Sequence, residues 1–396
     1  MTLLNEARLN EKLAEHELDA IVATAPENVT YTTGYWALSQ WIRRGPQTYV
    51  VWPAPGRGAP QIVASAGLLD LIADQRIAVE KVHKFGDFFV SQEPDAVLGD
   101  IDRRQSRLYA LPNGGSAAAC LEQALAGLEL NGGRIGIDEG GLPPSLASPL
   151  SQSLEDFSVV PAFEIFRQVR AVKTQSEVSR LASAARAAEA SIDAALRVAA
   201  PGVTELEMAR EFNLETVRHD VLPVLFCIGF GPRSAMPNVQ PSDAALKEGD
   251  IIRFDVGGRF EHYRADIARI AVLGEPSHKI KTYHDALHKG VLSGFEAIRP
   301  GAKAADIFDR VVKTVQREGI PHYQRSHVGH GIGIDGYDLP ILSASSPDII
   351  EAGMVLCVET PYYELGFGGL QVEDMIVVRE DGVQSLMNSS GALRVV

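Results

Sequence analysis

The order of apolar and polar positions changes character partway along the chain. In the first part, short apolar runs alternate with amphipathic segments. Within residues 1–20, Leu9, Leu13 and Leu18 lie among polar residues, which predicts a surface helix. The runs at 19–26, 48–67 and 134–141 are rich in Val and Ile and are bounded by Gly or Pro, which predicts strands, two of them within 48–67. The pattern indicates an α/β unit with a mixed sheet.

The second part begins with a long alanine-rich stretch, residues 174–202, that predicts a helix. Thr174 followed by Glu177 fits a capping box, in which each side chain satisfies a free backbone amide at the helix start. Gly202 is placed to end this helix. We therefore expect two domains: an N-terminal α/β domain over residues 1–165 and a second domain over residues 166–396.

The second part also contains a weak internal repeat. Residues 200–212 resemble 299–311, and residues 246–257 resemble 349–361. Aligning Gly249 with Gly353 places Asp255 on Glu359. A little further along, each half supplies a second acid. The repeat predicts two α/β halves that form a pseudo-symmetric cup, with two carboxylates from each half.

The four acids are Asp255, Asp266, Glu359 and Glu373, and the first of each pair ends an apolar run. A buried carboxylate persists only where something cationic meets it. Residues 255–266 predict one hairpin with its turn near Gly257 and Gly258, which would bring two of the acids together. Taken singly, an acid at a strand end is more often a cap or a salt-bridge partner; the repeat favours a shared site.

The glycine-rich segment 326–340 adds an imidazole, His330. Four carboxylates and one imidazole provide ligands for two divalent ions, whose charge the acids would balance. An oxygen-rich set with one nitrogen suits Mn, Co, Zn or Fe(II) rather than a thiolate-selective site. His327 would lie on the opposite face from His330 if the segment is an extended strand, so we expect it to support the site or the fold rather than to act in catalysis.

These blocks, in this order, resemble the pita-bread metallopeptidase superfamily, which includes Xaa-Pro dipeptidase, aminopeptidase P, methionine aminopeptidase and creatinase. The carrying stretches are LKEGDIIRFDVGGRFEHYRADIARI, GHGIG, GMVLCVETP and GLQVEDM. The resemblance covers roughly residues 170–390. It implies the creatinase/prolidase branch: an N-terminal creatinase-like mixed-sheet domain followed by a pseudo-symmetric catalytic domain.

The resemblance further implies that the four acids and His330 bind two metal ions. A bridging water would then be the nucleophile, and Glu359 would serve as general base and later as proton donor.

Three positions depart from the peptidase pattern. Asn238 and Tyr337 stand where peptidase relatives carry histidines, and Gln371 stands where aminopeptidase P-like members often carry arginine. Asn238 and Tyr337 could act in catalysis and Gln371 in substrate binding. A phenol donates a hydrogen bond but is uncharged near neutral pH. Core packing is an equally good interpretation of Tyr337. Because the ligands are retained while these positions differ, we expect metal-dependent hydrolysis with altered substrate recognition.

Charge and composition argue against several classes of binding partner and several cellular locations. The chain has 396 residues and a net charge of −14, which argues against binding to nucleic acid or an anionic membrane. The first 20 residues lack the pattern of a signal peptide, and no apolar run has the length of a membrane span. The three cysteines show no zinc-knuckle spacing and are expected to be buried apolar residues in a reducing cytoplasm.

Residues 33–47 place two tryptophans and two arginines in one segment. The resemblance implies a homodimer in which the N-terminal domain caps the active site of the partner. On this hypothesis Trp41 and Arg43 or Arg44 bind an apolar group and a carboxylate of the substrate, since arginine matches carboxylate geometry. The alternative is a buried tryptophan beside a surface salt bridge.

The leading interpretation is a cytoplasmic dinuclear metal hydrolase that cleaves an amide C–N bond in a small molecule or dipeptide, most like Xaa-Pro dipeptidase. A second interpretation keeps the fold but changes the substrate: a non-peptide C–N hydrolase resembling creatinase or ectoine hydrolase, or a lyase of the sulfoniopropionate type. A third is a pita-bread binding module without catalysis.

Overall fold

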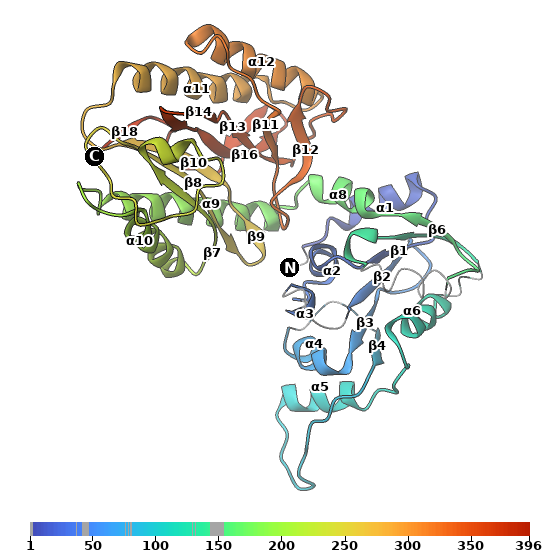
Figure 1. The fold of residues 1–396 in the computed structure, drawn as a ribbon. Coiled ribbons are helices and arrows are strands. Elements are labelled where there is room, and N and C mark those ends of the chain that lie inside the picture. Colours follow the sequence, from blue (N-terminus) through green and yellow to red (C-terminus); the bar gives the residue numbers. More distant parts are fainter. Residues whose placement is uncertain are drawn as a thin grey trace. The chain divides into compact units, whose positions relative to one another are not determined.

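A computed structural model describes residues 3–396 except 37, 42–46, 76, 78, 80, 129, 131 and 143–153. The chain divides into two compact units, Met1–Val169 and Arg170–Val396 (Figure 1). The division falls inside a helix, α8 (Phe163–Ala171), shortly after the position where the sequence texture changes.

Unit 1 is built on a mixed sheet, as the alternating apolar runs predict. Among its described residues the sheet has the order β4-β3-β2-β1-β5-β6, in which β1 runs antiparallel to β2 and parallel to β5. Its buried core contains side chains of β1, β2, β3, β5 and α6. The elements are α1 (Glu6–Glu15), β1 (Ala20–Ala23), α2 (Pro26–Thr33), α3 (Leu38–Trp41), β2 (Tyr49–Pro53), β3 (Gln61–Ser65), α4 (Leu69–Gln75), β4 (Lys81–Phe85), α5 (Asp100–Tyr109), α6 (Ala117–Ala126), β5 (Arg134–Ile137) and β6 (Ser158–Pro161).

Unit 2 contains one large sheet whose central path is β12-β11-β13-β16-β10-β8-β7. Short strands add to it: β17 pairs with β16, β18 with β10 and β9 with β8, while β14 and β15 form a separate pair. The strands are β7 (Leu222–Phe230), β8 (Ile251–Phe260), β9 (Tyr263–Arg264), β10 (Ile267–Val272), β11 (His327–Gly331), β12 (Asp338–Ser343), β13 (Val355–Glu359), β14 (Tyr362–Glu364), β15 (Gly368–Leu370), β16 (Glu373–Arg379), β17 (Gly382–Ser385) and β18 (Arg394–Val395).

Four helices of unit 2 pack on this sheet, one pair for each half (Figure 1). Helices α9 and α10 contact β8 and β7, whereas α11 and α12 contact β13 and β11. Each helix turns an apolar face inward, and these faces supply much of the core of the unit. The helices are α9 (Gln175–Leu196), α10 (Glu205–Arg218), α11 (His278–Ala297) and α12 (Ala304–Glu318).

Helix α9 begins as predicted and ends earlier than predicted. The Thr174–Glu177 capping box is present at its start. The helix ends at Leu196, however, and Gly202 lies beyond it in a turn with φ of 92°. Pro201 accounts for part of this difference, because the residue before a proline is disfavoured in the helical region.

The backbone confirms the internal repeat. Gly202 N–H donates to the carbonyl of Leu246 at 2.8 Å, and Gly301 N–H donates to that of Ile350, also at 2.8 Å. The aligned glycines that follow, Gly249 and Gly353, have φ of 84° and 86°. The same hydrogen-bonded connection is therefore made twice, once in each half, as a pseudo-symmetric domain requires.

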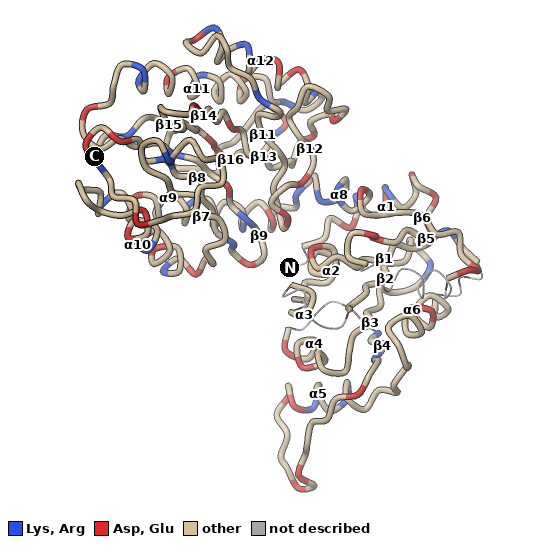
Figure 2. The backbone as a smooth tube through the Cα atoms, in the orientation of Figure 1, with Lys and Arg blue, Asp and Glu red and all other residues tan. Residues whose placement is uncertain are grey.

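Among the described residues, no helix combines the length and apolar character needed to cross a membrane. Acidic and basic positions are interleaved over both units (Figure 2). The excess of acids that gives the net charge of −14 is thus spread along the chain rather than gathered in one run.

Candidate metal centre

The candidate acids lie on one face of the large sheet. Asp255 on β8 pairs with Ala268 on β10, Ala268 pairs with Glu373 on β16, and Glu373 pairs with Glu359 on β13. Directly opposed residues in antiparallel strands point to the same face. Asp266, two residues before Ala268, shares that face because side chains alternate along a strand. Strand pairing across the two halves thus brings together acids that are far apart in sequence; the first, Asp255, and the last, Glu373, are 118 positions apart.

His330 reaches this face from β11, where it pairs with Cys357 of β13. Its side chain is 1% exposed, and its Nδ1 lies 3.0 Å from the carbonyl oxygen of Gly331. That carbonyl accepts a hydrogen bond from Nδ1–H, which leaves the lone pair of Nε2 available. A metal-ligating histidine commonly has this second hydrogen bond, because it fixes the tautomer and the ring orientation.

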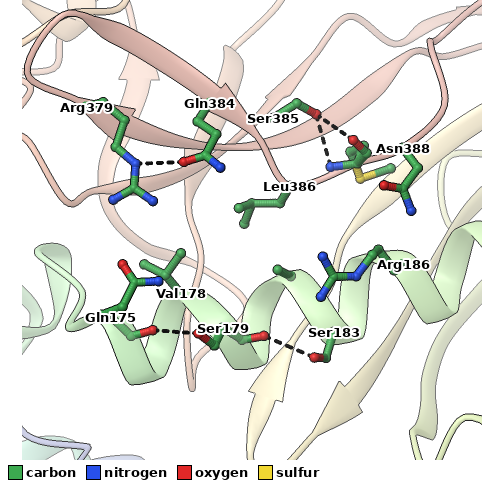
Figure 3. A pocket seen from close by; sticks show the side chains of 12 residues that line it. Gln175, Val178, Ser179, Ser183, Arg186, Arg379, Gln384, Ser385, Leu386 and Asn388 are labelled. Atoms are coloured by element: carbon green, nitrogen blue, oxygen red, sulfur yellow. Dashed lines mark hydrogen bonds between the residues drawn. The ribbon is translucent and has the colours of Figure 1, made fainter.

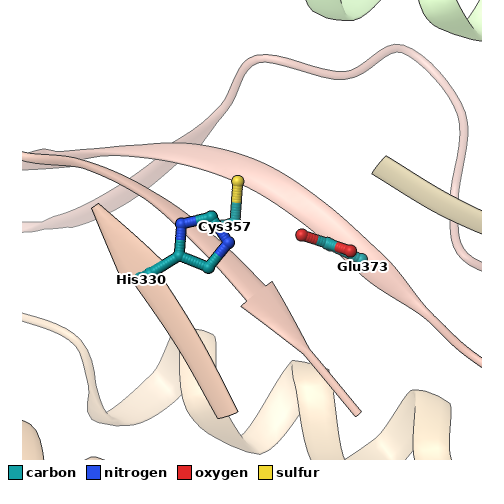
Figure 4. A group of neighbouring side chains, drawn as sticks. All are labelled: His330, Cys357 and Glu373. Atoms are coloured by element: carbon teal, nitrogen blue, oxygen red, sulfur yellow. The ribbon is translucent and has the colours of Figure 1, made fainter. Parts of the chain in front are cut away.

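Ligand atoms converge on Glu373 from two sides. One atom each from Asp255, Asp266 and Glu373 lie within 4.8 Å of one another, and so do atoms of His330, Cys357 and Glu373. Figure 4 shows the second group, with the Cys357 sulfur beside the His330 ring and the Glu373 carboxylate. Glu373 belongs to both groups, whereas the predicted ligand Glu359 belongs to neither.

The electrostatics of the acids favour a cation in their midst. Burial raises the pKa of Asp255 to about 6, although the Arg253 charge opposes the shift. Burial, and then repulsion from neighbouring acids, raises the pKa values of Asp266 and Glu373 well above the usual range. Within the described chain, Oδ1 of Asp266 is buried without a hydrogen-bond partner. Divalent ions would relieve both the repulsion and the unsatisfied oxygen, so the residues fit a dinuclear site.

Glu359 differs from the other acids because basic groups surround it. Its Oε1 lies 2.9 Å from Nε2 of His327, and its Oε2 lies 3.9 Å from Nη2 of Arg325. Burial raises the pKa of Glu359, but the hydrogen bond with His327 and the electrostatic interactions with His330 and Arg325 outweigh it and lower the pKa. Glu359 is therefore held as a carboxylate by the protein itself.

The expectation that His327 faces away from His330 was wrong. Strand β11 is irregular: its register with β12 shifts between His327 and His330, and Gly329 has φ of 152°. A side chain at position 329 would collide with the carbonyl of Cys357, since an added Cβ would lie 2.2 Å from that oxygen. The irregularity breaks the simple alternation and turns His327 toward Glu359.

The predicted turn of the first hairpin was also misplaced. Gly257 and Gly258 lie inside β8, and the turn falls at Glu261 and His262, which have φ of 42° and 80°. Gly257 is needed for close packing instead, because a Cβ there would lie 1.8 Å from the carbonyl oxygen of Ala265. Asp255 and Asp266 still approach each other, because they lie on either side of this turn, Asp255 on β8 and Asp266 directly before β10.

The three residues expected to face substrate, Tyr337, Asn238 and Gln371, differ in exposure and in contacts. The Tyr337 ring stacks on His330, with centroids 3.8 Å apart and planes 18° apart, yet the residue is 51% exposed. Asn238 is exposed in the segment after β7. Gln371 is buried, and its Nε2 donates to Oε2 of Glu373 at 3.2 Å. The roles of these three residues stay predictions.

In unit 1, the Trp41 ring stacks on Trp36 with centroids 4.6 Å apart, and its Nε1 donates to Thr30 Oγ1 at 3.3 Å. Arg43 and Arg44 lie outside the described residues. The proposed substrate contacts of this segment therefore stay untested predictions.

Two residues at the centre, Arg253 and Cys357, were missed in sequence, and the contact of His327 with Glu359 was not expected. A signal for Arg253 was present, because a charged residue interrupts the apolar run IIRFDVG two positions before Asp255 and so shares its face. Cys357 is fully buried, as expected of a cysteine in an apolar run. Its place two residues before Glu359 on the same strand was the signal that its sulfur faces the site.

A polar groove of about 470 Å³ elsewhere in unit 2 shares no residue with the candidate ligands (Figure 3). It lies between α9 and the β16–β17 hairpin, and the side chains that line it include Gln175, Ser179, Ser183, Arg186, Arg379, Gln384 and Asn388.

Comparisons with known proteins agree with this architecture. Residues 7–172 match the profile of the creatinase/prolidase N-terminal domain, and residues 179–380 match that of metallopeptidase family M24. An uncharacterized peptidase of Staphylococcus aureus (strain USA300) is 29% identical over 222 residues, 56% of this chain and 63% of the relative. The match therefore spans less than two thirds of that protein. The uncharacterized peptidase YqhT of Bacillus subtilis is 29% identical over 260 residues, 65% of this chain and 73% of the relative.

Solved structures share the fold along almost the whole chain. The Xaa-Pro dipeptidase from Bacillus anthracis has a TM-score of 0.80 at 21% identity, covering 98% of both chains. Dipeptidase PepE from Mycobacterium ulcerans has a TM-score of 0.80 at 26% identity, covering 98% of this chain and 96% of that one. The fold class and the resemblance inferred from sequence are thereby confirmed. With the family profile matched over half of its length, the chain belongs to metallopeptidase family M24 and carries a creatinase/prolidase N-terminal domain.

Proposed function

We propose that this protein is a dinuclear metal-dependent hydrolase that cleaves the amide bond of a small substrate, with Xaa-Pro dipeptides as the first class to test. The observation that supports it best is the strand pairing that places Asp255, Glu373 and Glu359 in one row of the sheet, with ligand atoms of Asp255 and Asp266 on one side of Glu373 and of His330 on the other. The ligand set is Asp255, Asp266, His330, Glu359 and Glu373, for two ions of Mn, Zn, Co or Fe. When bound, such ions supply Lewis acidity that lowers the pKa of a water and polarises the scissile carbonyl.

Glu359 is the residue best placed to move a proton. The hydrogen bond from His327 fixes one of its oxygens, and the neighbouring cationic groups keep it ionised, as a general base needs. Ser326 Oγ lies 3.0 Å from Nδ1 of His327, so a short chain of hydrogen bonds orients the imidazole toward the carboxylate. Replacing His327 by Gln should lower kcat about 10-fold. A positioned acid–base group contributes roughly 10²–10⁴-fold, and in this variant Glu359 remains and loses only the hydrogen bond that orients it.

Tyr337 is proposed as a hydrogen-bond donor to the developing oxyanion. Burial and the charges of nearby acids, Glu359 first among them, raise the pKa of Tyr337, so its hydroxyl stays protonated and able to donate at any ordinary pH. Asn238 is proposed to bind the substrate backbone through its amide. Tyr337→Phe keeps the ring that stacks on His330 and removes only the donor; a kcat close to that of the unmodified chain would reduce the tyrosine to packing.

A second candidate function is hydrolysis of a non-peptide amide or amidine, or the lyase chemistry of the same fold. The observation that favours it is the replacement of two expected histidines by Asn238 and Tyr337 around a retained ligand set. The titratable imidazoles that would serve a peptide bond are replaced by groups that are neutral near pH 7. On this alternative the same face of the sheet holds the metals, and only the substrate differs.

The decisive experiment loads the protein with Mn, Co, Zn or Fe(II) and assays Xaa-Pro dipeptides beside creatine-like and ectoine-like compounds. Asp255→Asn and Glu359→Gln serve as inactive controls. Turnover of the dipeptides supports the first proposal, and turnover confined to the non-peptide compounds supports the second. Less than one tightly bound divalent ion per chain, with no turnover of any compound, would contradict both and favour a binding module without catalysis.

The proposal includes a cytoplasmic homodimer in which the segment with Trp41, Arg43 and Arg44 contributes to substrate binding. The resemblance to the creatinase/prolidase branch supports this part. Replacing both arginines by Ala should raise KM for a substrate with a free carboxylate and leave kcat nearly unchanged, since arginine binds carboxylates in a bidentate manner. An unchanged KM would contradict it.

A further inference from the structure

Arg253 is a fully buried arginine at the heart of unit 2. It lies on β8 two residues before Asp255, so both side chains point to the same face of the sheet. Burying a guanidinium is costly unless it is paired and its donors are satisfied. Nε of Arg253 has no hydrogen-bond partner among the described residues, whereas both Nη atoms are bonded, so the contacts of those two atoms indicate what the residue does.

The guanidinium of Arg253 donates to both halves of the candidate centre. Nη1 lies 3.1 Å from Oδ2 of Asp255 and 2.9 Å from Oε1 of Gln371. Gln371 in turn donates through its Nε2 to Oε2 of Glu373 at 3.2 Å. Arg253 thus holds one candidate ligand directly and another through a single amide. Asp255 belongs to the first half of the repeat and Glu373 to the second.

The other nitrogen of the guanidinium fixes the segment that carries Asn238. Nη2 donates to the carbonyl oxygens of Met236 at 2.7 Å and of Pro237 at 2.9 Å. The group also lies 5.2 Å from the ring centroid of Tyr363, whose hydroxyl donates to the same Gln371 oxygen at 3.2 Å. A single planar cation therefore connects the ligands to a substrate-facing loop, a task for which the compact ammonium of lysine lacks the geometry.

The arrangement also bears on Gln371. Gln371 lies two residues before Glu373, and the guanidinium that it meets comes from β8, with β10 between β8 and β16. We propose that Arg253 is a positioning residue for the metal centre. It orients Asp255 directly and Glu373 through Gln371, and it fixes the loop before Asn238. This assignment rests on the proposed dinuclear site.

The test uses cobalt, because Co(II) reports both affinity and ligand geometry through its visible spectrum. The full chain is stripped of metal and titrated with Co(II), and its spectrum is compared with that of Arg253→Gln. Loss of a group that orients a metal ligand typically lowers metal affinity about 10–100-fold. We expect a loss of this size for Arg253→Gln, a changed spectrum, and a rise in KM because the 236–238 loop is released.

Two further variants separate positioning from general stability. Arg233→Gln is the matched control: Arg233 binds the Glu205 carboxylate and the Gln240 carbonyl, so it supports the same loop but touches no candidate ligand. Its cobalt affinity should stay within about two-fold of the unmodified chain, well short of the loss expected at Arg253. The double variant Arg253→Gln, Gln371→Arg returns a guanidinium to the site and should recover most of the lost affinity.

The outcomes separate clearly. An Arg253→Gln protein that binds Co(II) with unchanged affinity and spectrum overturns the proposal, as does an equal loss in Arg233→Gln or a double variant no better than the single one. If Arg253→Gln does not fold, Gln371→Met interrupts the link to Glu373, together with the hydrogen bond from Tyr363, and leaves the Asp255 contact in place. Unchanged cobalt affinity in that variant overturns the proposal too. An unmodified chain that binds no Co(II) contradicts the proposed function itself, and this assignment with it.

Discussion

Asp338 lies between two buried cations, and this predicts a large loss of stability when its charge is removed. The residue begins β12, next to Tyr337, and is fully buried. Nε and Nη2 of Arg170 lie 3.1 and 2.8 Å from its Oδ1, and Nζ of Lys173 lies 3.7 Å from its Oδ2. Asp338→Asn keeps the shape and hydrogen-bonding oxygen but leaves the two cations without this counter-charge.

Removing one partner from a buried ion pair costs about 3–5 kcal/mol, because the remaining charge is uncompensated. For a unit of this size, that corresponds to a fall in Tm of roughly 6–20 °C. Burial lowers the pKa of Lys173, an effect that the Asp338 charge opposes. A cation whose pKa is depressed in the folded state destabilises it at low pH and loses this effect as pH rises. The penalty of Asp338→Asn should therefore shrink from pH 7 towards pH 10.

The measurement is thermal unfolding followed by far-UV circular dichroism. All three tryptophans, at 36, 41 and 52, lie in unit 1, so their fluorescence serves as an internal reference that should move less. Asp335→Asn is the matched control: Asp335 is 3.6 Å from Arg170, but its side chain is 39% exposed, so about 0–1 kcal/mol is expected. Equal stability losses in the two variants, or a loss below about 1 kcal/mol in Asp338→Asn, would refute the reasoning.

Three other predictions concern buried acids and glycines of unit 2. Metal uptake should release protons, more at pH 6 than at pH 8, because burial raises the pKa of Asp255 to about 6 in the metal-free chain; calorimetry in buffers of different ionisation enthalpy measures this, and no release would contradict it. Burial raises the pKa of Glu177 to about 7, so its contribution of up to about 3 kcal/mol is present at acidic pH and lost as pH rises through 7. Glu177→Gln should flatten the pH dependence of stability between pH 5 and 8, and unchanged slopes would refute this. Gly329→Ala should lower metal affinity and Tm sharply, whereas Gly202→Ala, with an open left-handed position, should cost only about 1 kcal/mol; similar melting curves would count against the packing argument.

Many secondary-structure elements of this protein could be predicted from its sequence, because the patterns that indicate them are local. Apolar runs bounded by Gly and Pro gave the strands, and the Thr174–Glu177 pair gave the start of α9. The internal repeat placed Asp255 on Glu359, and strand pairing then put both in the same row as Glu373. Equivalent residues of the two repeats occupy equivalent places in the fold, so the sequence alone was enough to pair Asp255 with Glu359.

Tertiary structure alone decided what surrounds those acids. An irregularity at Gly329 turned His327 towards Glu359, against the simple alternation of a strand. A guanidinium from β8 crossed over β10 to meet Gln371. Both contacts join residues that are far apart in sequence, and their geometry depends on register shifts and close backbone approaches that no local pattern encodes. Sequence therefore identified the candidate ligands, whereas the packing of the sheet determined which groups orient them and set their charge.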